Sequence, residues 1–280
     1  MSRRRWLAVG VVAGVIGLAA IVQARQPPPP ESVDFAPDIV YGTVGGETLH
    51  LDLARPKRGA GPFPLIVCIH GGGWQAGNKA EFRQAIFSLA EQGFAAASLE
   101  YRFAPRHRFP AQYDDVKEAV RFLRDRAKEW NLDAGRVAAF GGSAGGHLAL
   151  LLATDPEVRL RAAVSAAGPT DLSRPFPEFA ARLVRDLIGP PPADPVAFRR
   201  SIDPIDRLGP HVAPLLLIHG DRDEIVPYEQ SVLLHEACKR AGLSSELITI
   251  PGGGHGGGGR KEDQDAAIIR AVNFLRDHLK

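Results

Sequence analysis

The sequence predicts an α/β protein with a mostly parallel, doubly wound sheet, helices on both faces and a small cap insertion. Two patterns lead to this prediction. Short apolar runs alternate with longer amphipathic segments, and several runs are apolar throughout, as in strands buried on both faces. About 245 of the 280 residues follow an atypical N-terminal stretch, a length that suits one large domain with a fully buried core.

The N-terminus has the pattern of an export signal. Three arginines at residues 3–5 precede an uncharged apolar run at residues 6–22, and Ala24 supplies a small residue before a possible cleavage point. We expect an exported protein, periplasmic or secreted, in which residues 1–24 are either removed as the signal or retained as a membrane anchor. Contact with a membrane is expected only through residues 6–22, if the anchor is retained.

Proline content marks the domain organisation. Four consecutive prolines at residues 27–30 predict an extended linker over residues 25–34, before one folded domain over residues 35–280. Residues 168–210 hold nine prolines and one convincing short helix, around residues 178–188. Because this segment lies between two expected strands, it is predicted to cross the carboxyl ends of the strands as a cap. A long ordered connection is the alternative.

The remaining elements alternate between strand and helix. A hairpin at the sheet edge is expected from residues 38–43 and 49–53, which flank Gly45-Gly46. The other expected strands are 63–69, 94–99, 136–140, 162–166, 215–219 and 246–250. The expected helices are 80–92, one whose apolar face runs from Val116 to Trp130, 144–154, 229–241 and 263–279. Such alternation implies right-handed crossovers between parallel strands.

Composition and charge exclude several classes of partner. The net charge is +2, with much of the excess in the N-terminal arginines, so no basic patch indicates nucleic-acid binding. Cys68 and Cys238 each lie in an apolar pattern and are interpreted as small buried residues, although a disulfide between them stays open. Cysteine and histidine spacings typical of metal sites are absent, and neither a metal nor an organic cofactor is expected.

A candidate nucleophile, Ser143, lies where an apolar strand turns directly into a helix. Gly141 and Gly145 flank it in a G-x-S-x-G pattern, and they relieve the crowding that such a sharp turn creates. The hydroxyl would then project near the positive end of the following helix. A Gly/Ser turn without a chemical role is the alternative for this motif taken alone.

A serine nucleophile also needs donors for the oxyanion, and the segment His70-Gly-Gly-Gly-Trp74 offers them. The backbone N–H groups of Gly72 and Gly73 would form the oxyanion hole together with that of Ala144. A phosphate-binding loop is the weaker alternative, because no Lys-Ser/Thr pair follows the glycines. Trp74 is expected either to line the acyl or alcohol pocket or to pack in the interior.

The candidate base and acid come later in the chain. His255 is flanked by seven glycines, on a loop expected to reach over Ser143, and such surroundings do not suit a core histidine. Metal binding is its alternative, but no second ligand lies nearby in sequence. Three carboxylates, Asp221, Asp223 and Glu224, follow a strand, and spacing alone does not choose among them.

The chain order of serine, acid and histidine is that of α/β-hydrolases. Further motifs agree, namely His70-Gly-Gly-Gly-Trp74, Tyr101-Arg102 with Pro105, Phe109-Pro110-Ala111, Asp114-Asp115-Val116, Gly141-Gly-Ser-Ala-Gly-Gly146, His219-Gly-Asp221 through Pro227, and Gly254-His255. The chain resembles the hormone-sensitive-lipase-like and feruloyl/acetyl-esterase group of α/β-hydrolases, the BD-FAE-like carboxylesterases. This resemblance implies that the acid is Asp223, four residues before the proline, and that Asp221 is a turn residue.

Four other polar residues are given structural roles. Asp114 and Asp115 are expected to cap a helix, with support of the catalytic loops as the alternative, and His70 and His147 are expected to bond backbone groups beside the site.

The expected function is a serine hydrolase that cleaves short-chain carboxylic esters through an acyl-enzyme. The acyl group is expected to be acetyl or similarly small, on a small molecule or a carbohydrate, because the compact chain leaves little room for a wide lipid-binding lid. Two alternatives stay open. One is an amide or formamide hydrolase of arylformamidase type, and the other is an inactive hydrolase fold that serves as a binding module.

Overall fold

A computed structural model describes residues 28–190 and 193–280 of the chain. The predicted export signal or anchor at residues 1–24 lies outside the described residues, as do residues 25–27 of the predicted linker. The first strand begins at Val33, two residues before the predicted start of the domain. Among the described residues, no helix combines the length and the apolar character that crossing a membrane requires.

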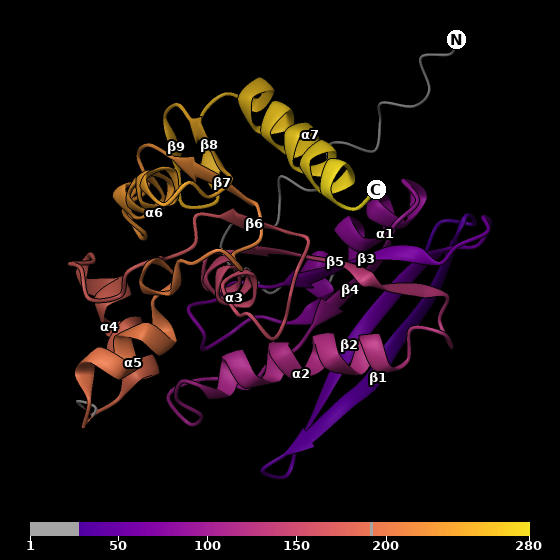
Figure 1. The fold of residues 1–280 in the computed structure, drawn as a ribbon, viewed down its shortest axis with the longest axis horizontal. Coiled ribbons are helices and arrows are strands. Elements are labelled where there is room, and N and C mark those ends of the chain that lie inside the picture. Colours follow the sequence, from indigo (N-terminus) through magenta and orange to yellow (C-terminus); the bar gives the residue numbers. More distant parts are fainter. Residues whose placement is uncertain (1–27, 191–192) are drawn as a thin grey trace.

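One eight-stranded sheet runs through the domain in the order β1-β2-β4-β3-β5-β6-β7-β8 (Figure 1). The β1/β2 and β2/β4 pairs are antiparallel, and every pair from β4 to β8 is parallel. The strands are β1 Val33–Val44, β2 Glu47–Pro56, β3 Phe63–Ile69, β4 Ala95–Leu99, β5 Leu132–Gly142, β6 Ala162–Ala166, β7 Leu215–Gly220 and β8 Ser245–Ile250. The predicted hairpin and the mostly parallel sheet are thereby confirmed.

Helices cover both faces of this sheet. They are α1 Arg83–Glu91, α2 Ala111–Asp125, α3 Ala144–Ala153, α4 Glu178–Ile188, α5 Pro195–Ile202, α6 Glu229–Arg240 and α7 Lys261–His278, with short 3₁₀ helices at Lys79–Phe82 and Pro204–Arg207. Leu65 and Val67 of β3 pack into one apolar cluster with α2, α3 and α6, whereas Ile66 packs into a second cluster with α1 and α7. This two-sided burial explains why β3 reads as a continuous apolar run.

Three predictions about helices are corrected. The helix α2 ends at Asp125, so Trp130 lies beyond it. This helix begins at Ala111 after Pro110 without a side-chain cap, and the prediction that Asp114 and Asp115 cap it is wrong. The helix α5 was missed, although its start has a readable signal: the Asp194 side chain accepts from the N–H groups of Val196 and Ala197, and proline follows it directly.

The segment 168–210 contains α4, α5 and the 3₁₀ turn Pro204–Arg207, and it lies together at one end of the domain (Figure 1). Its helix α4 is fixed to the loop before α2, because the N–H of Phe109 donates to the carbonyl of Leu187 at 3.0 Å. A carbon added at Gly73, just after β3, would lie 2.6 Å from Leu183 Cδ1 of α4. The segment therefore contacts the loop at the carboxyl end of β3.

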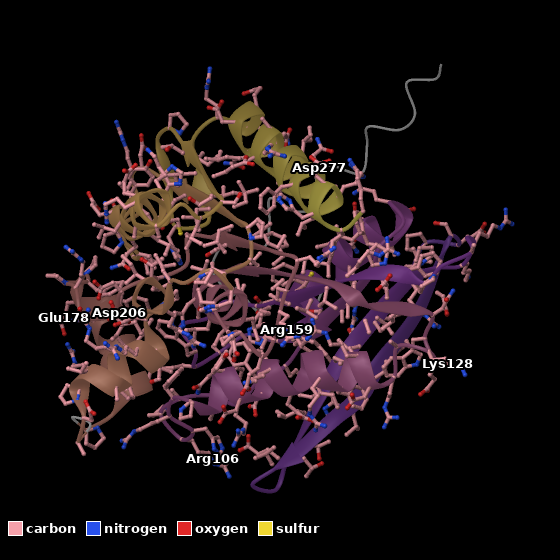
Figure 2. All side chains as sticks on the ribbon, viewed as in Figure 1. Arg106, Lys128, Arg159, Glu178, Asp206 and Asp277 are labelled. Atoms are coloured by element: carbon pink, nitrogen blue, oxygen red, sulfur yellow. The ribbon has the colours of Figure 1, made fainter. Side chains whose placement is uncertain are left out.

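Polar and thiol groups divide between surface and interior. Charged residues of both signs are distributed over the whole domain in Figure 2, among them Arg106, Lys128, Arg159, Glu178, Asp206 and Asp277. Cys68 and Cys238 are both buried free thiols, and burial raises the pKa of each. They therefore behave as the small interior residues that the sequence predicted.

Candidate active site

Ser143 lies at the sharp turn between β5 and α3. Its backbone has φ 54° and ψ −122°, a conformation that L-residues rarely adopt, and its N–H donates to the carbonyl of Ala166 at 2.8 Å. The first turn of α3 lies directly against the end of β3, because a carbon added at Gly145 would be 2.0 Å from the carbonyl oxygen of Ile69. Glycine is therefore required there, and the turn is held although the serine backbone is strained.

The strain at Ser143 gives a stability prediction. We expect Ser143→Gly to be more stable than Ser143→Ala by about 1 kcal/mol, since glycine adopts a positive φ without steric cost and both changes remove the hydroxyl. The free energy of unfolding in urea, measured for both variants, checks this expectation. Equal stabilities, or a more stable alanine variant, would show that the turn stores no strain.

The structure brings Ser143, His255 and Asp223 into one line of hydrogen bonds. His255 Nε2 lies 2.8 Å from Ser143 Oγ, and His255 Nδ1 lies 2.7 Å from Asp223 Oδ2. The three residues follow β5, β7 and β8, whose carboxyl ends meet at the same edge of the sheet. The Asp223 side chain is fully buried, whereas 13% of the His255 side chain is exposed. An imidazole in this position can take a proton from the serine while the carboxylate fixes its tautomer.

Asp223 is held as a carboxylate by donors on both of its oxygens. Oδ1 accepts from the N–H groups of Ile225 and Val226, both at 2.9 Å, and Oδ2 accepts from His255 and from His219. Burial opposes ionisation, but these hydrogen bonds outweigh it and hold the pKa of the Asp223 carboxyl well below its usual range. These hydrogen bonds therefore favour the charged form of Asp223.

The loop that carries His255 is tied down. The strands β9 (Gly253–Gly254) and β10 (Gly257–Gly258) form a small antiparallel hairpin with His255 in its turn. This hairpin is joined to the acid loop, because Arg222 N donates to Gly253 O at 2.8 Å and Gly252 N donates to the Asp221 carboxylate at 2.7 Å. Asp221 therefore joins the acid loop to the hairpin of His255, and no hydrogen bond between Asp221 and His255 is found among the described residues. The glycines place the base in a fixed hairpin, a feature that the sequence did not predict.

The three predicted oxyanion donors lie on two adjoining segments. Gly72 and Gly73 have φ values of +94° and +60°, and the carbonyl of Gly72 accepts from the N–H groups of Gln75 and Ala76. The N–H groups of Gly72 and Gly73 find no acceptor within residues 28–190 and 193–280. Ala144 is the first residue of α3, where a helix leaves its N–H unpaired. These three N–H groups therefore have no hydrogen-bond acceptor among the described residues.

Trp74 and His147 link the oxyanion loop, residues 71–73, to α3 and to the segment 168–210. Trp74 is 3% exposed, and its Nε1–H donates to His147 Nδ1 at 3.2 Å. Of the two predictions for Trp74, the structure therefore agrees with the one in which it packs in the interior. His147 Nε2 in turn donates to the carbonyl of Ile202 at 2.7 Å. His70 bonds the Gly71 carbonyl through Nδ1 at 2.9 Å, so both histidines bond backbone groups as predicted.

His147 gives a pH-dependent stability prediction. Burial lowers the pKa of its imidazole from 6.5 to about 4. Between these pH values the unfolded chain binds a proton that the folded protein does not. The contribution of neutral His147 to the free energy of unfolding is therefore fully present above about pH 6.5 and is lost as the pH falls toward 4. We expect the change from pH 7 to pH 5 to cost the wild type about 2 kcal/mol more than it costs His147→Gln. Urea unfolding at both pH values tests this, and an equal loss in both proteins would contradict it.

Tyr101, which the sequence analysis quoted only as part of a motif, supports the loop that carries Gly72 and Gly73. The Tyr101 hydroxyl donates to the carbonyls of Gly71 and His70 at 2.9 and 3.1 Å. The next residue, Arg102, is fixed by Asp115, which accepts from its backbone N–H and from its guanidinium. Asp115 is therefore a buried ion-pair partner that holds Arg102 in the loop after β4.

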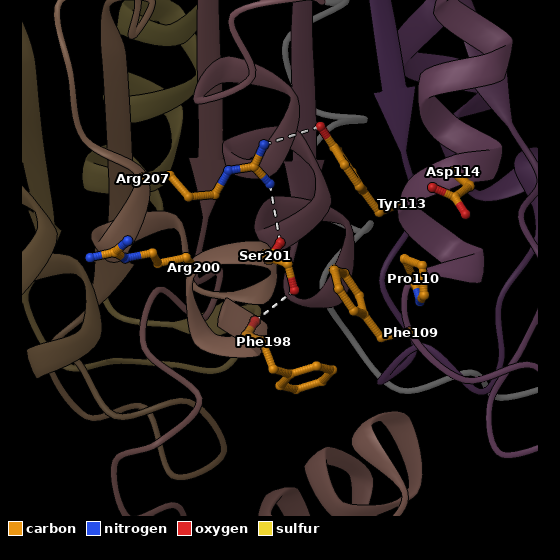
Figure 3. Close-up of a pocket in the computed structure, with 8 residues that line it drawn as sticks. All are labelled: Phe109, Pro110, Tyr113, Asp114, Phe198, Arg200, Ser201 and Arg207. Atoms are coloured by element: carbon orange, nitrogen blue, oxygen red, sulfur yellow. Dashed lines mark hydrogen bonds between the residues drawn. The ribbon is translucent and has the colours of Figure 1, made fainter. Parts of the chain in front are cut away.

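A cavity of about 340 Å³ lies at the border of α2 and α5 (Figure 3). Its lining residues are Phe109, Pro110, Tyr113, Asp114, Phe198, Arg200, Ser201 and Arg207. The Arg207 guanidinium there donates to the Tyr113 hydroxyl and to the Ser201 carbonyl. None of these lining residues belongs to the line of Ser143, His255 and Asp223.

No group of three or more His, Cys, Asp or Glu side chains in the described part of the chain could hold a metal ion.

Comparisons with known proteins identify the family of the chain. The model of the BD-FAE family matches residues 51–238. Esterase LipC of Mycobacterium tuberculosis is 34% identical over 78% of this chain, and the chain spans 59% of the length of LipC. Ethyl acetate hydrolase of Pseudomonas putida is 28% identical over 88% of this chain and 84% of its own length.

The solved structures that are similar to this chain include a truncated carbohydrate esterase from gut microbiota, which superposes on it with a TM-score of 0.76. It is 26% identical and covers 89% of this chain and 98% of its own. The comparisons therefore group the chain with carboxylesterase-type hydrolases of the α/β-hydrolase fold.

Proposed function

Because the chain belongs to the BD-FAE family, we propose that it is a serine carboxylesterase that hydrolyses short-chain esters, acetyl or similar, on small molecules or on carbohydrate. The observation that carries this proposal is the His255 imidazole, whose nitrogens lie 2.8 Å from Ser143 Oγ and 2.7 Å from the Asp223 carboxylate. The names of the ethyl acetate hydrolase and of the carbohydrate esterase among the similar proteins support the substrate class.

The first half of the reaction forms an acyl-enzyme. His255 Nε2 takes the proton of Ser143 while Oγ bonds to the ester carbonyl carbon, and the carbonyl oxygen becomes an oxyanion. The N–H groups of Gly72, Gly73 and Ala144 donate to it, each contributing about 3 kcal/mol to transition-state stabilisation. The protonated His255 then donates to the leaving alcohol oxygen, and the ester C–O bond breaks.

The second half releases the acid. A water attacks the acyl carbon and gives a proton to His255 Nε2, and that proton returns to Ser143 Oγ when the acyl–serine bond breaks. Asp223 keeps the proton on Nδ1 throughout and stabilises the imidazolium that forms twice in each cycle. The carboxylate stays ionised, which agrees with its depressed pKa.

The position of the segment 168–210, the cap, favours a substrate with a small acyl group. Leu183 of α4 packs on Gly73, where an added carbon would be 2.6 Å from Leu183 Cδ1. An apolar side chain of the cap therefore stands beside the oxyanion loop and takes space that a long acyl chain would need.

A substrate panel with covalent labelling tests the proposed function. We expect p-nitrophenyl acetate and acetylated xylo-oligosaccharide to be hydrolysed with higher kcat/KM than p-nitrophenyl palmitate or an N-formyl anilide, and a fluorophosphonate to label Ser143. Faster cleavage of the formamide would assign the chain to amide hydrolysis. Labelling and hydrolysis that are both absent would indicate an inactive fold.

A further inference from the structure

A second imidazole contacts the carboxylate that orients His255. His219 is the penultimate residue of β7, and its side chain is fully buried. Its Nε2 lies 3.1 Å from Asp223 Oδ2, the same oxygen that accepts from His255 Nδ1 at 2.7 Å. Two histidines from different segments therefore share one carboxylate oxygen, and only one of them reaches Ser143.

The surroundings of His219 fix its tautomer. Nε2 also lies 3.0 Å from the carbonyl oxygen of Val226, so both of its neighbours are acceptors and the ring must carry a proton there. Nδ1 lies 2.7 Å from Oγ of Ser231, a buried hydroxyl of α6 that donates to it. The ring thus forms hydrogen bonds through both of its nitrogens, and it cannot turn without losing these contacts.

We propose that His219 is a positioning residue: its Nε2–H holds Asp223 Oδ2 in the place where this oxygen accepts from His255. The bonds from Ile225 and Val226 fix the other oxygen, so within residues 28–190 and 193–280 His219 is the one donor besides His255 that acts on Oδ2. The hydrogen bonds then run in one direction, from Ser231 to His219 to Asp223. This inference rests on the proposed function, because it assigns His219 to the same catalytic line.

Kinetics of two variants test the inference. We expect His219→Leu to lower kcat for p-nitrophenyl acetate by about 10- to 100-fold with little change in KM, since the misplaced carboxylate no longer orients His255. His219→Gln carries an amide nitrogen near the position of Nε2 and is expected to recover most of this loss. His235→Leu is the matched control, because His235 bonds Ser245 Oγ and lies outside the catalytic line. Equal kcat in wild type and His219→Leu, or no recovery with glutamine, would overturn the proposal.

A spectroscopic measurement separates this inference from the proposed function. The His255 Nδ1–H, donated to a carboxylate, is expected to give a low-field proton NMR signal in the free protein, and the loss of this signal in His255→Gln assigns it, because His219 donates to the same carboxylate and stays in place. We expect His219→Leu to shift this signal and His235→Leu to leave it in place, whether or not any ester is hydrolysed. Ser231→Ala keeps the imidazole but removes its hydroxyl donor, and we expect a smaller shift, which serves if His219→Leu does not fold. An unmoved signal in the folded His219 and Ser231 variants would overturn the proposal.

Discussion

Ser143→Ala is expected to lower kcat for p-nitrophenyl acetate by about 10⁶-fold. The reason is that the acyl-enzyme cannot form without Oγ, which lies 2.8 Å from the nitrogen that would deprotonate it. The oxyanion donors of Gly72, Gly73 and Ala144 do not depend on this hydroxyl, so a small rate above that in water is expected to remain. Steady-state kinetics with purified protein, together with the loss of fluorophosphonate labelling, measures this effect.

Ser165→Ala is the matched control. Ser165 lies in β6, beside the strand that carries the nucleophile, and within the described residues its buried hydroxyl has no hydrogen-bond partner. Removing this hydroxyl breaks no bond, so kcat and labelling are expected to stay at their wild-type values. Full activity in Ser143→Ala would refute the assigned nucleophile. Equal losses in both variants would point to damage to the fold and not to missing chemistry.

Asp223→Asn is expected to lower kcat by about 10⁴-fold. An amide can turn its NH₂ group toward His255 Nδ1, and this favours the tautomer with the proton on Nε2, which cannot accept from Ser143. The change also leaves the imidazolium without a negative partner at 2.7 Å. A kcat measurement at the pH of maximal activity checks the prediction, and calorimetry shows whether the variant is folded.

The neighbouring carboxylate supplies the control for this variant. Asp221 accepts from Gly252 N at 2.7 Å and has no bond to His255. We expect Asp221→Asn to keep kcat close to that of the wild type, because its amide oxygen can still accept from Gly252. If Asp221→Asn caused the larger loss, the acid would be assigned to the wrong residue of the pair.

Most strands of the sheet could be predicted, because the sequence patterns that indicate them extend over only a few neighbouring residues. The continuous apolar run of β3 and the alternation of strands with helices depend on residues that are neighbours in sequence. The helix α5 was missed because the prolines around it read as a loop, and only the Asp194-Pro195 start indicates a helix. The hairpin that holds His255 was also missed, because glycine carries no strand pattern and the hairpin depends on contacts with the acid loop.

The sequence by itself determined the architecture, the serine at the strand-to-helix turn and the residue types of a catalytic triad, because crowding and hydrophobic periodicity act within a few residues. Spacing left three carboxylates open, and a family resemblance, not spacing, selected among them. Only the tertiary structure decided which atoms meet: His255 lies 112 residues from Ser143 and 32 residues from Asp223 in sequence. Their contact, and that of His219 with the same carboxylate, depends on the strand order that brings the carboxyl ends of β5, β7 and β8 to one edge.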